Sequence, residues 1–322
     1  MTIRRWASMI ALVAVSVLIA LSVGAAALSM HDVWAAVSGD PAADTARAIL
    51  FDVRLPRILA ALFVGAALAL AGTVLQATFA NPLIEPSLVG ISGAAGVGAI
   101  VLCGIVGTTS PTIGAIGAVV FAGVGMWWLG RSGMRGSKFV LLGIAWGSLA
   151  TGLIATAASL PDLNQGRSLT SWVFGSLALA TNDELPLLVV AGLAGVALLW
   201  RQALPLDIVA LGPESAHYLG VQVEKKRLRW LIAASLLVAP TVALFGVIGF
   251  VGLVVPHVWR LLGVVRHREL LPLSAVSGGV LVLLADSIAR TAGGASEIPV
   301  GVVLSVLGAP MLLWLLRRSD DV

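Results

Sequence analysis

The sequence predicts an all-α protein that crosses a lipid bilayer about ten times. Hydrophobic residues make up 59% of the 322 residues and charged residues only 11%, which is more apolar surface than a water-soluble domain can bury. Aromatic residues contribute 6%, whereas glycine occurs 36 times, and small residues allow helix backbones to approach closely in lipid. We therefore expect a single transmembrane domain that extends over residues 1–322.

Ten apolar segments reach or approach the ~20 residues that a membrane span requires. The first is too long for the ~7–15-residue apolar core of a signal peptide, so we interpret it as an uncleaved span. The seventh and eighth form one continuous apolar run, and one span plus a re-entrant piece is the alternative there, so that eight or nine spans stay possible. The segments are residues 7–29, 57–79, 87–107, 111–130, 139–159, 184–200, 230–247, 248–264, 270–289 and 299–316.

The basic residues support the ten-span topology. With a cytoplasmic N-terminus, five of the 20 lysines and arginines lie outside and the other 15 lie inside, in agreement with the positive-inside rule. Both termini are then cytoplasmic, and the net charge of +4 reflects membrane insertion rather than nucleic-acid binding. The five outer residues are Arg47, Arg54, Arg57, Arg167 and Arg290.

One long polar segment, residues 206–230, interrupts the apolar chain between the sixth and seventh spans. It predicts two short helices, because Asp207 suits the N-cap of the first and the Gly-Pro pair at 212–213 breaks the chain. Gly220 suits the position just after the second helix, residues 214–219. We interpret this cytoplasmic segment as a surface on which another protein acts. A solvated loop that only directs topology is the alternative.

No pattern in the sequence predicts catalysis or metal binding. A phosphate-binding loop is absent, the four histidines have no partner at metal-ligand spacing, and the single Cys103 excludes an intrachain disulfide and a cysteine-based metal cluster. We therefore expect that the chain is not an enzyme, carries no cofactor or metal, and does not itself hydrolyse ATP.

Asp286 is the one acidic residue well inside a predicted span. Arg290 follows four residues later on the same helical face, in the favourable acid-first order. A structural ion pair is the preferred interpretation, because no second acid inside the membrane is available to accept a proton. A proton relay, as in a secondary transporter, is the alternative.

Arg54 and Arg57 lie on either side of Pro56 at the outer start of the second span. The predicted outer segments contain eight acidic residues against five basic ones, so cations kept there suggest binding to an acidic partner or ligand. Arginines that merely extend toward the headgroups are the alternative. After the same span, the motif NPLIEP at Asn81–Pro86 predicts a rigid two-proline turn, which suits a gate at the inner mouth.

Six long motifs follow one another along the chain: RLPRILAALFVGAALALAGTVLQATFANPLIEPSLVGISGAAGVGA, LGPESAHYLGV, GVIGFVGLVVPHVWRLLG, HRELLPLSAVSGG, LADSIAR and EIPVGVVLSVLGAP. Together they resemble the permease subunits of ABC importers for iron chelates, haem and cobalamin. The similarity covers nearly the whole chain after residue 50. The resemblance implies a homodimer with a central path in the bacterial inner (plasma) membrane, amid membrane lipid, with a cytoplasmic ATP-binding subunit dimer and a periplasmic substrate-binding protein.

The resemblance also implies roles for single residues. Arg54, Arg57 and Arg290 match arginines that dock the binding protein through its glutamates. Asn81 and Leu83 match the asparagine and leucine that narrow the cytoplasmic gate. The loop between spans six and seven matches the coupling helices that contact the ATPase, which assigns this role to Glu214, Ser215, Ala216, His217, Leu219 and Gly220.

The substrate is the least determined part of the resemblance. The stretch RSLTSWVFGSL, residues 167–177, is similar to haem permeases, in which an arginine before such a stretch lies beside the translocation path. Arg167 is therefore assigned to the path. Because siderophore permeases have similar stretches, the resemblance favours an iron chelate, with haem slightly ahead of a ferric siderophore, and cobalamin is the alternative.

Overall fold

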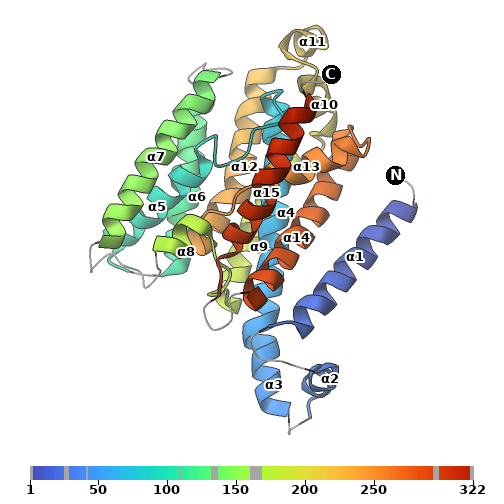
Figure 1. The fold of residues 1–322 in the computed structure, drawn as a ribbon. Coiled ribbons are helices and arrows are strands. Elements are labelled where there is room, and N and C mark those ends of the chain that lie inside the picture. Colours follow the sequence, from blue (N-terminus) through green and yellow to red (C-terminus); the bar gives the residue numbers. More distant parts are fainter. Residues whose placement is uncertain are drawn as a thin grey trace.

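A computed structural model describes residues 3–24, 29–40, 43–108, 110–131, 137–159, 169–292 and 297–319, which form a bundle of helices (Figure 1). None of the residues in these ranges is in a β-strand. The all-α class predicted from composition and apolar segment length is therefore confirmed for the described chain.

Each of the ten predicted segments falls on an apolar helix of the described chain. Six helical runs are long and apolar enough to cross a membrane, and four apolar helices are shorter. Ten crossings therefore remain a prediction, whereas six spanning candidates are observed. The six runs contain α1 (Ile3–Ser22), α4 (Leu55–Thr78), α6 (Pro111–Arg131), α9 (Leu185–Leu199), α12 (Val223–Phe245) and α14 (His267–Ala292). The four shorter apolar stretches belong to α5 (Ile91–Val106), α7 (Ser137–Ser159), α13 (Val251–Leu261) and α15 (Val300–Ser319).

The second span begins earlier than predicted. Its helical run is continuous through α3 (Asp44–Ala48), a π-helix (Ile49–Arg54) and α4. Pro56 has no N–H to donate to the carbonyl four residues earlier, and its ring crowds that carbonyl, so a regular α-helix is disfavoured there. The wider π turns immediately before Pro56 accommodate this conflict without ending the helix, and they carry Arg54 at their end.

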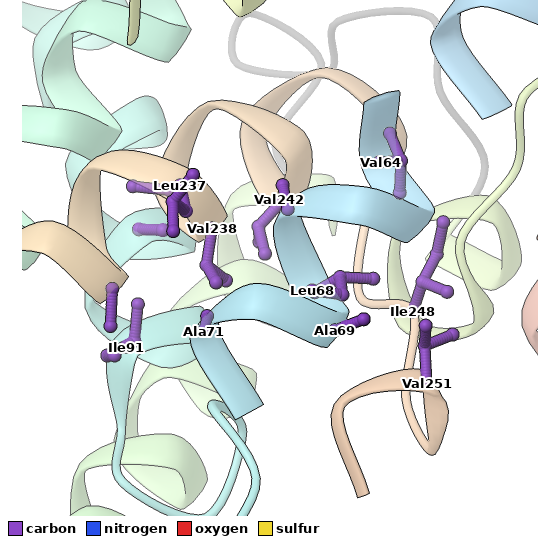
Figure 2. Close-up of a cluster of buried hydrophobic side chains, with 14 of the residues drawn as sticks. Val64, Leu68, Ala69, Ala71, Ile91, Leu237, Val238, Val242, Ile248 and Val251 are labelled. Atoms are coloured by element: carbon purple, nitrogen blue, oxygen red, sulfur yellow. The ribbon is translucent and has the colours of Figure 1, made fainter. Parts of the chain in front are cut away.

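Helix α4 occupies the centre of the bundle, where α14, α12, α13 and α9 pack against it (Figure 1). Figure 2 shows part of the resulting core, in which buried side chains of α4, α5, α12 and α13 gather. Among them are Val64, Leu68, Ile91, Val242 and Val251.

Two glycine contacts bring neighbouring backbones directly onto α4. A Cβ atom added to Gly65 would overlap the carbonyl of Gly278 in α14, and one added to Gly72 would overlap Gly252 in α13. Only glycine permits such close approach, which replaces side-chain interdigitation where helices pack in lipid. These contacts fix α14 and α13 against the central helix.

The two ends of the bundle carry different short helices. Figure 1 places α2 (Met30–Ser38) and α3 at one end, and α10 (Ala203–Ala210) and α11 (Pro213–Tyr218) at the other. We call these the outer end and the inner end, following the predicted topology. The remaining short elements are α8 (Leu169–Phe174) and a 3₁₀ turn at Asn182–Glu184. Which end faces the cytoplasm remains a prediction from the basic residues.

Candidate functional site

Five charged residues form a compact group at the outer end, which we call the arginine cluster. It consists of Arg54, Arg57, Asp286, Arg290 and Glu297, from the π-helix, α4, α14 and the segment before α15. Three guanidinium groups and two carboxylates give the cluster a formal charge of +1. Because the three arginines come from different turns and helices, their convergence depends on the packing of α14 against α4.

Arg57 is the centre of the cluster, since all three of its side-chain nitrogens bind carboxylate oxygens. Its Nε donates to Oδ1 and Oδ2 of Asp286 at 3.1 and 3.0 Å, and its Nη2 donates to Oδ1 at 2.9 Å. Its Nη1 donates to Oε1 and Oε2 of Glu297 at 3.1 and 2.8 Å. Charge-assisted bonds of this fork-like kind are the strongest ordinary hydrogen bonds in proteins.

The other two arginines bind the end of α1. Arg54 donates from Nη1 to the carbonyl of Leu21, and Arg290 donates from Nη2 to the carbonyl of Ala20 at 3.4 Å. The last carbonyls of a helix have no partner within it and carry the negative end of the helix dipole, so cations are favourable there. The two guanidinium groups therefore cap α1 and hold it to the rest of the bundle.

The structure corrects the expected exposure of the docking arginines. Arg54, Arg57 and Arg290 are buried, with 3%, 6% and 5% of their surface accessible, whereas both interpretations of Arg54 and Arg57 in the sequence assumed side chains that reach outward. The reason is that local helices and acids supply partners for all three. Their role in docking stays a prediction, but they do not form a free basic surface.

Asp286 forms the structural ion pair predicted with Arg290, whose Nε lies 3.2 Å from Oδ2. The prediction was incomplete, because Asp286 also binds Arg57, 229 residues away in the sequence. Asp286 has 1% of its surface accessible and serves two cations. Glu297, the second acid of the cluster, has no local signal in the sequence beyond its position next to a predicted span.

The turn after α4 contains the predicted gate residues Asn81 and Leu83. The side chain of Asn81 accepts a hydrogen bond from the backbone N–H of Leu83 at 2.9 Å, which is the Asx-turn geometry. Asn81 is exposed and Leu83 half-buried, while Ile84 is buried in the core. The turn is therefore built locally and presents Asn81, Pro82 and part of Leu83 at the surface of the subunit.

Glu85 ties this turn to α13, a contact that the sequence did not reveal. Its Oε2 accepts a hydrogen bond from the backbone N–H of Phe250 at 3.0 Å, and its Oε1 accepts one from Ser87. Phe250 precedes the first residue of α13 and has a left-handed backbone, with φ of 68°. Glu85 thus satisfies a donor at the start of α13 and links the predicted gate to that helix.

At the inner end, residues 206–220 contain parts of two short helices, as predicted. The second, α11, ends in a Schellman motif: Val221 N–H donates to the carbonyl of Ala216 at 2.9 Å, and Gly220 N–H donates to that of His217 at 3.0 Å. Gly220 has φ of 72°, the left-handed conformation that this motif requires. The glycine signal in the sequence therefore located the helix end.

The predicted N-cap role of Asp207 in the first helix is wrong. Helix α10 already begins at Ala203, and Asp207 lies within it. Asp207 instead caps α14: its Oδ1 accepts the backbone N–H of His267 at 2.8 Å and lies 2.6 Å from His267 Nδ1. Helix α14 is consequently held to α10 at its inner end and to the arginine cluster at its outer end.

Helix α11 and its C-cap residue, Leu219, project some side chains into solvent and bury others. Tyr218 and Leu219 have 87% and 61% of their surface accessible, but Ala216 has none. Of the predicted coupling residues, Ala216 therefore supports the loop from inside and does not offer a contact surface. Glu214, His217 and Gly220 border an open hollow of about 980 Å³ that is also lined by Phe79 and Arg227, beside the predicted gate turn.

Two further expectations concern the path and metals. Arg167, assigned to the translocation path, lies outside the described residues. Within the described ranges, no three His, Cys, Asp or Glu side chains lie close enough together to hold a metal ion.

Comparison with known proteins identifies the relatives of this architecture. Residues 12–318 match the FecCD transport family. The chain is 37% identical over 321 residues to the vitamin B12 import system permease protein BtuC of Salmonella typhi, covering 98% of this chain and 95% of that protein. The protein of the same description from Salmonella newport strain SL254 has the same identity and coverage.

Solved structures give the same architecture. An inward-facing conformation described as that of a metal-chelate type ABC transporter superimposes with a TM-score of 0.84, at 28% identity, over 98% of this chain and all of that chain. PsaBC from Streptococcus pneumoniae, in complex with Fab, superimposes with a TM-score of 0.59 at 18% identity, over 87% of this chain and 94% of that one. The second likeness concerns the fold alone.

Proposed function

The chain belongs to the FecCD transport family, and on this premise we propose that it is the membrane-spanning permease of a binding-protein-dependent ABC importer that carries cobalamin. The observation that carries the proposal is similarity over nearly the full length: relatives at 37% identity across 98% of the chain are vitamin B12 permeases. Such coverage includes both bundle ends and the core between them. We propose that residues 1–322 act as one permease domain.

Cobalamin replaces haem as the preferred substrate. The preference for haem depends on a short stretch, residues 167–177, of which residues 167 and 168 lie outside the described chain. The similarity to vitamin B12 permeases extends over 321 residues and therefore weighs more than this stretch. A ferric siderophore or haem becomes the alternative cargo.

We propose that two copies of this chain assemble around a common path, with an ATP-binding subunit dimer at the inner end and a periplasmic substrate-binding protein at the outer end. The exposed Tyr218 of α11 and Leu219, which follows it, support the inner contact. The arginine cluster supports the outer contact, since each copy carries a net formal charge of +1 there after its own two carboxylates are counted, and this excess positive charge can orient an acidic protein.

In this scheme the chain performs no chemistry. ATP bound and hydrolysed on the partner subunits changes the relative stability of outward- and inward-facing states, and the permease transmits that bias through α11. Asn81 and Leu83 close the inner mouth, and Arg167 lies beside the path. The membrane is the bacterial inner membrane, with both termini cytoplasmic.

The proton-coupled alternative depends on Asp286 as a carboxylate that exchanges protons. In the structure this carboxylate binds Arg57 and Arg290 and is almost fully buried. Both of its oxygens are already engaged by these two cations, as expected for a structural ion pair. The geometry therefore favours a structural role for Asp286.

The proposal is tested by reconstitution of the chain with its ATP-binding subunit and substrate-binding protein in proteoliposomes. We expect uptake of radiolabelled cyanocobalamin that requires ATP and the binding protein and is unaffected by a protonophore. Haem and a ferric siderophore serve as competing cargoes. Uptake that persists without ATP and collapses with the protonophore would contradict the assignment as an ABC importer. Competition by haem alone would identify haem, and not cobalamin, as the substrate.

A further inference from the structure

The two carboxylates that hold Arg57 differ in accessibility. The side chain of Asp286 has 1% of its surface accessible, whereas that of Glu297 has 32%. Asp286 also forms an ion pair with Arg290 on its own helix. Among the described residues, Glu297 forms no ion pair with Arg290. One carboxylate is therefore fixed in the protein interior, and the other reaches Arg57 from the surface.

The bonds of Arg57 divide between these two acids by nitrogen atom. Nε and Nη2 bind Asp286, and Nη1 binds only Glu297. A guanidinium group has five N–H donors in a fixed plane, and Nη1 donates to both oxygens of Glu297, so another carboxylate can bind Nη1 in this geometry only by replacing Glu297. Glu297 is the one that an incoming group from outside can replace without exposing Asp286.

We propose that Glu297 occupies the docking position of Arg57 in the free permease and is displaced by a carboxylate of the substrate-binding protein. The inference rests on the proposed function, because it assumes that Arg57 is a docking residue. The partner is an acidic protein surface whose glutamate or aspartate reaches Nη1. Docking then exchanges one ion pair for another and forms no additional pair at this arginine.

This exchange explains how buried cations serve a surface contact. Arg57 remains neutralised at every stage, so neither the free nor the docked permease leaves a buried charge without a partner, which would be costly. It also limits the net contribution of Arg57 to docking, since the carboxylate that Arg57 gains is offset by the loss of Glu297. Displacement of Glu297 further releases the segment that leads, three residues later, into α15.

The test measures affinity of the substrate-binding protein of this importer, loaded with cyanocobalamin, for the permease complex in nanodiscs. Glu297→Gln removes the competing charge and keeps the side-chain shape, and we expect binding about two- to fivefold tighter, the range that a partly exposed ion pair supplies. Because docking of this variant forms a net new ion pair, its affinity should also fall more steeply with salt than that of the wild type.

A matched control separates exchange from general electrostatics. Asp183 is an exposed acid on the same predicted side and has no ion pair with the arginine cluster among the described residues. Asp183→Asn should change affinity much less than Glu297→Gln. Equal tightening by both variants would overturn the proposal, because it would show that any lost acid has this effect.

Two other outcomes distinguish the inference from the function on which it rests. Unchanged or weaker binding by Glu297→Gln, together with clear loss of binding by Arg57→Lys, would overturn the displacement of Glu297 and leave Arg57 as a docking residue. Unchanged binding by both Glu297→Gln and Arg57→Lys would overturn the docking role of Arg57 itself. Glu297→Ala provides a second variant, with the same gain expected, if the glutamine variant is unstable.

Discussion

Both ends of the bundle are predicted to bind another protein, yet they present opposite surfaces to it. The outer end buries its cations in ion pairs and helix caps, so that all three arginines have at most 6% of their surface accessible. The inner end projects Tyr218 and Leu219 into solvent beside an open hollow. A surface formed by exposed side chains is ready for contact, whereas the outer end must first exchange existing bonds.

This difference matches the two proposed partners. For the ATP-binding subunit proposed at the inner end, the exposed apolar side chains form a surface that needs no rearrangement before contact. For the binding protein proposed at the outer end, bonds to Arg57 are exchanged rather than added, so this arginine contributes little net free energy to docking.

The largest effect is expected from Arg57→Ala at the outer end. Loss of this arginine removes the ion-pair partner that the structure describes for Glu297. It also leaves the buried Asp286 with only one of its two cations, Arg290. Removal of one member of a buried ion pair typically costs about 3–5 kcal/mol. We expect a clearly lower unfolding temperature of the purified permease and little or no docking. Stability equal to the wild type would show that the cluster is not structurally important.

Charge reversal at the same end would be harder to interpret. Arg54→Glu with Arg57→Glu would place new carboxylates beside Asp286 and Glu297, so loss of docking could follow from misfolding. Arg54→Gln is the milder variant, because a glutamine can still donate a hydrogen bond to the carbonyl of Leu21, as Arg54 does. It should retain the fold and weaken docking modestly.

A smaller effect is expected from Leu219→Glu at the inner end. Leu219 is exposed, so the variant should fold normally, but the new charge opposes burial against the ATP-binding subunit. We expect uptake to fall about tenfold, equivalent to ~1.4 kcal/mol of contact free energy. ATP hydrolysis by the ATP-binding subunits, measured without the binding protein, should be the same in the presence and in the absence of the variant permease.

Two controls accompany this variant. Leu179→Glu introduces the same charge at another exposed leucine, outside α11, and should leave hydrolysis unaffected. Ala216→Glu, at a fully buried position of α11, should instead lower stability. If Leu219→Glu retained full uptake, the inner contact would have to be placed elsewhere on the loop.

A third effect is expected from Asp207→Ala, which removes the cap of α14. Loss of a side-chain cap typically costs ~1 kcal/mol, and His267 also loses its side-chain partner. We expect a modest decrease in unfolding temperature together with weaker coupling between hydrolysis and uptake. Asp207→Asn retains an acceptor oxygen and should restore much of both. A decrease in stability without any change in coupling would limit Asp207 to a structural role.

The smallest energetic effect is expected from Leu83→Cys, because Leu83 is only half-buried. If Leu83 of two copies meets at the inner mouth, the variant should form a cross-linked dimer on oxidation, with a yield that changes with nucleotide. Cys103→Ser in the same chain removes the only native thiol. Absence of cross-linking in every nucleotide state would place the gate elsewhere.

Local features of both ends could be predicted from the sequence, but long-range ones could not. The i,i+4 pair of Asp286 with Arg290 and the glycine that ends α11 follow from neighbouring residues, and both are present. The bonds of Arg57 to Asp286 and Glu297 join residues 229 and 240 positions apart, and that of Glu85 to Phe250 joins residues 165 apart. Such pairs are determined by helix packing, which apolar periodicity does not specify.

The errors have the same origin. Asp207 has the residue type of an N-cap and does cap a helix, but the helix is α14, 60 positions away. Ala216 lies in a predicted surface helix, yet in the folded chain it faces inward. Pro56 predicts a helix start, and the π turns that allow the helix to continue through it have no simple sequence pattern.

Helix α14 has 26 residues and is therefore about 39 Å long at ~1.5 Å per residue. Its ends are bonded to α10 and to the arginine cluster, and Gly278, near its midpoint, touches the backbone of α4 at Gly65. A stiff rod with a contact at its middle acts as a lever on that fulcrum. Any tilt of α14 about this contact moves its two ends in opposite directions, so that an inward swing at the inner end becomes an outward swing at the outer end.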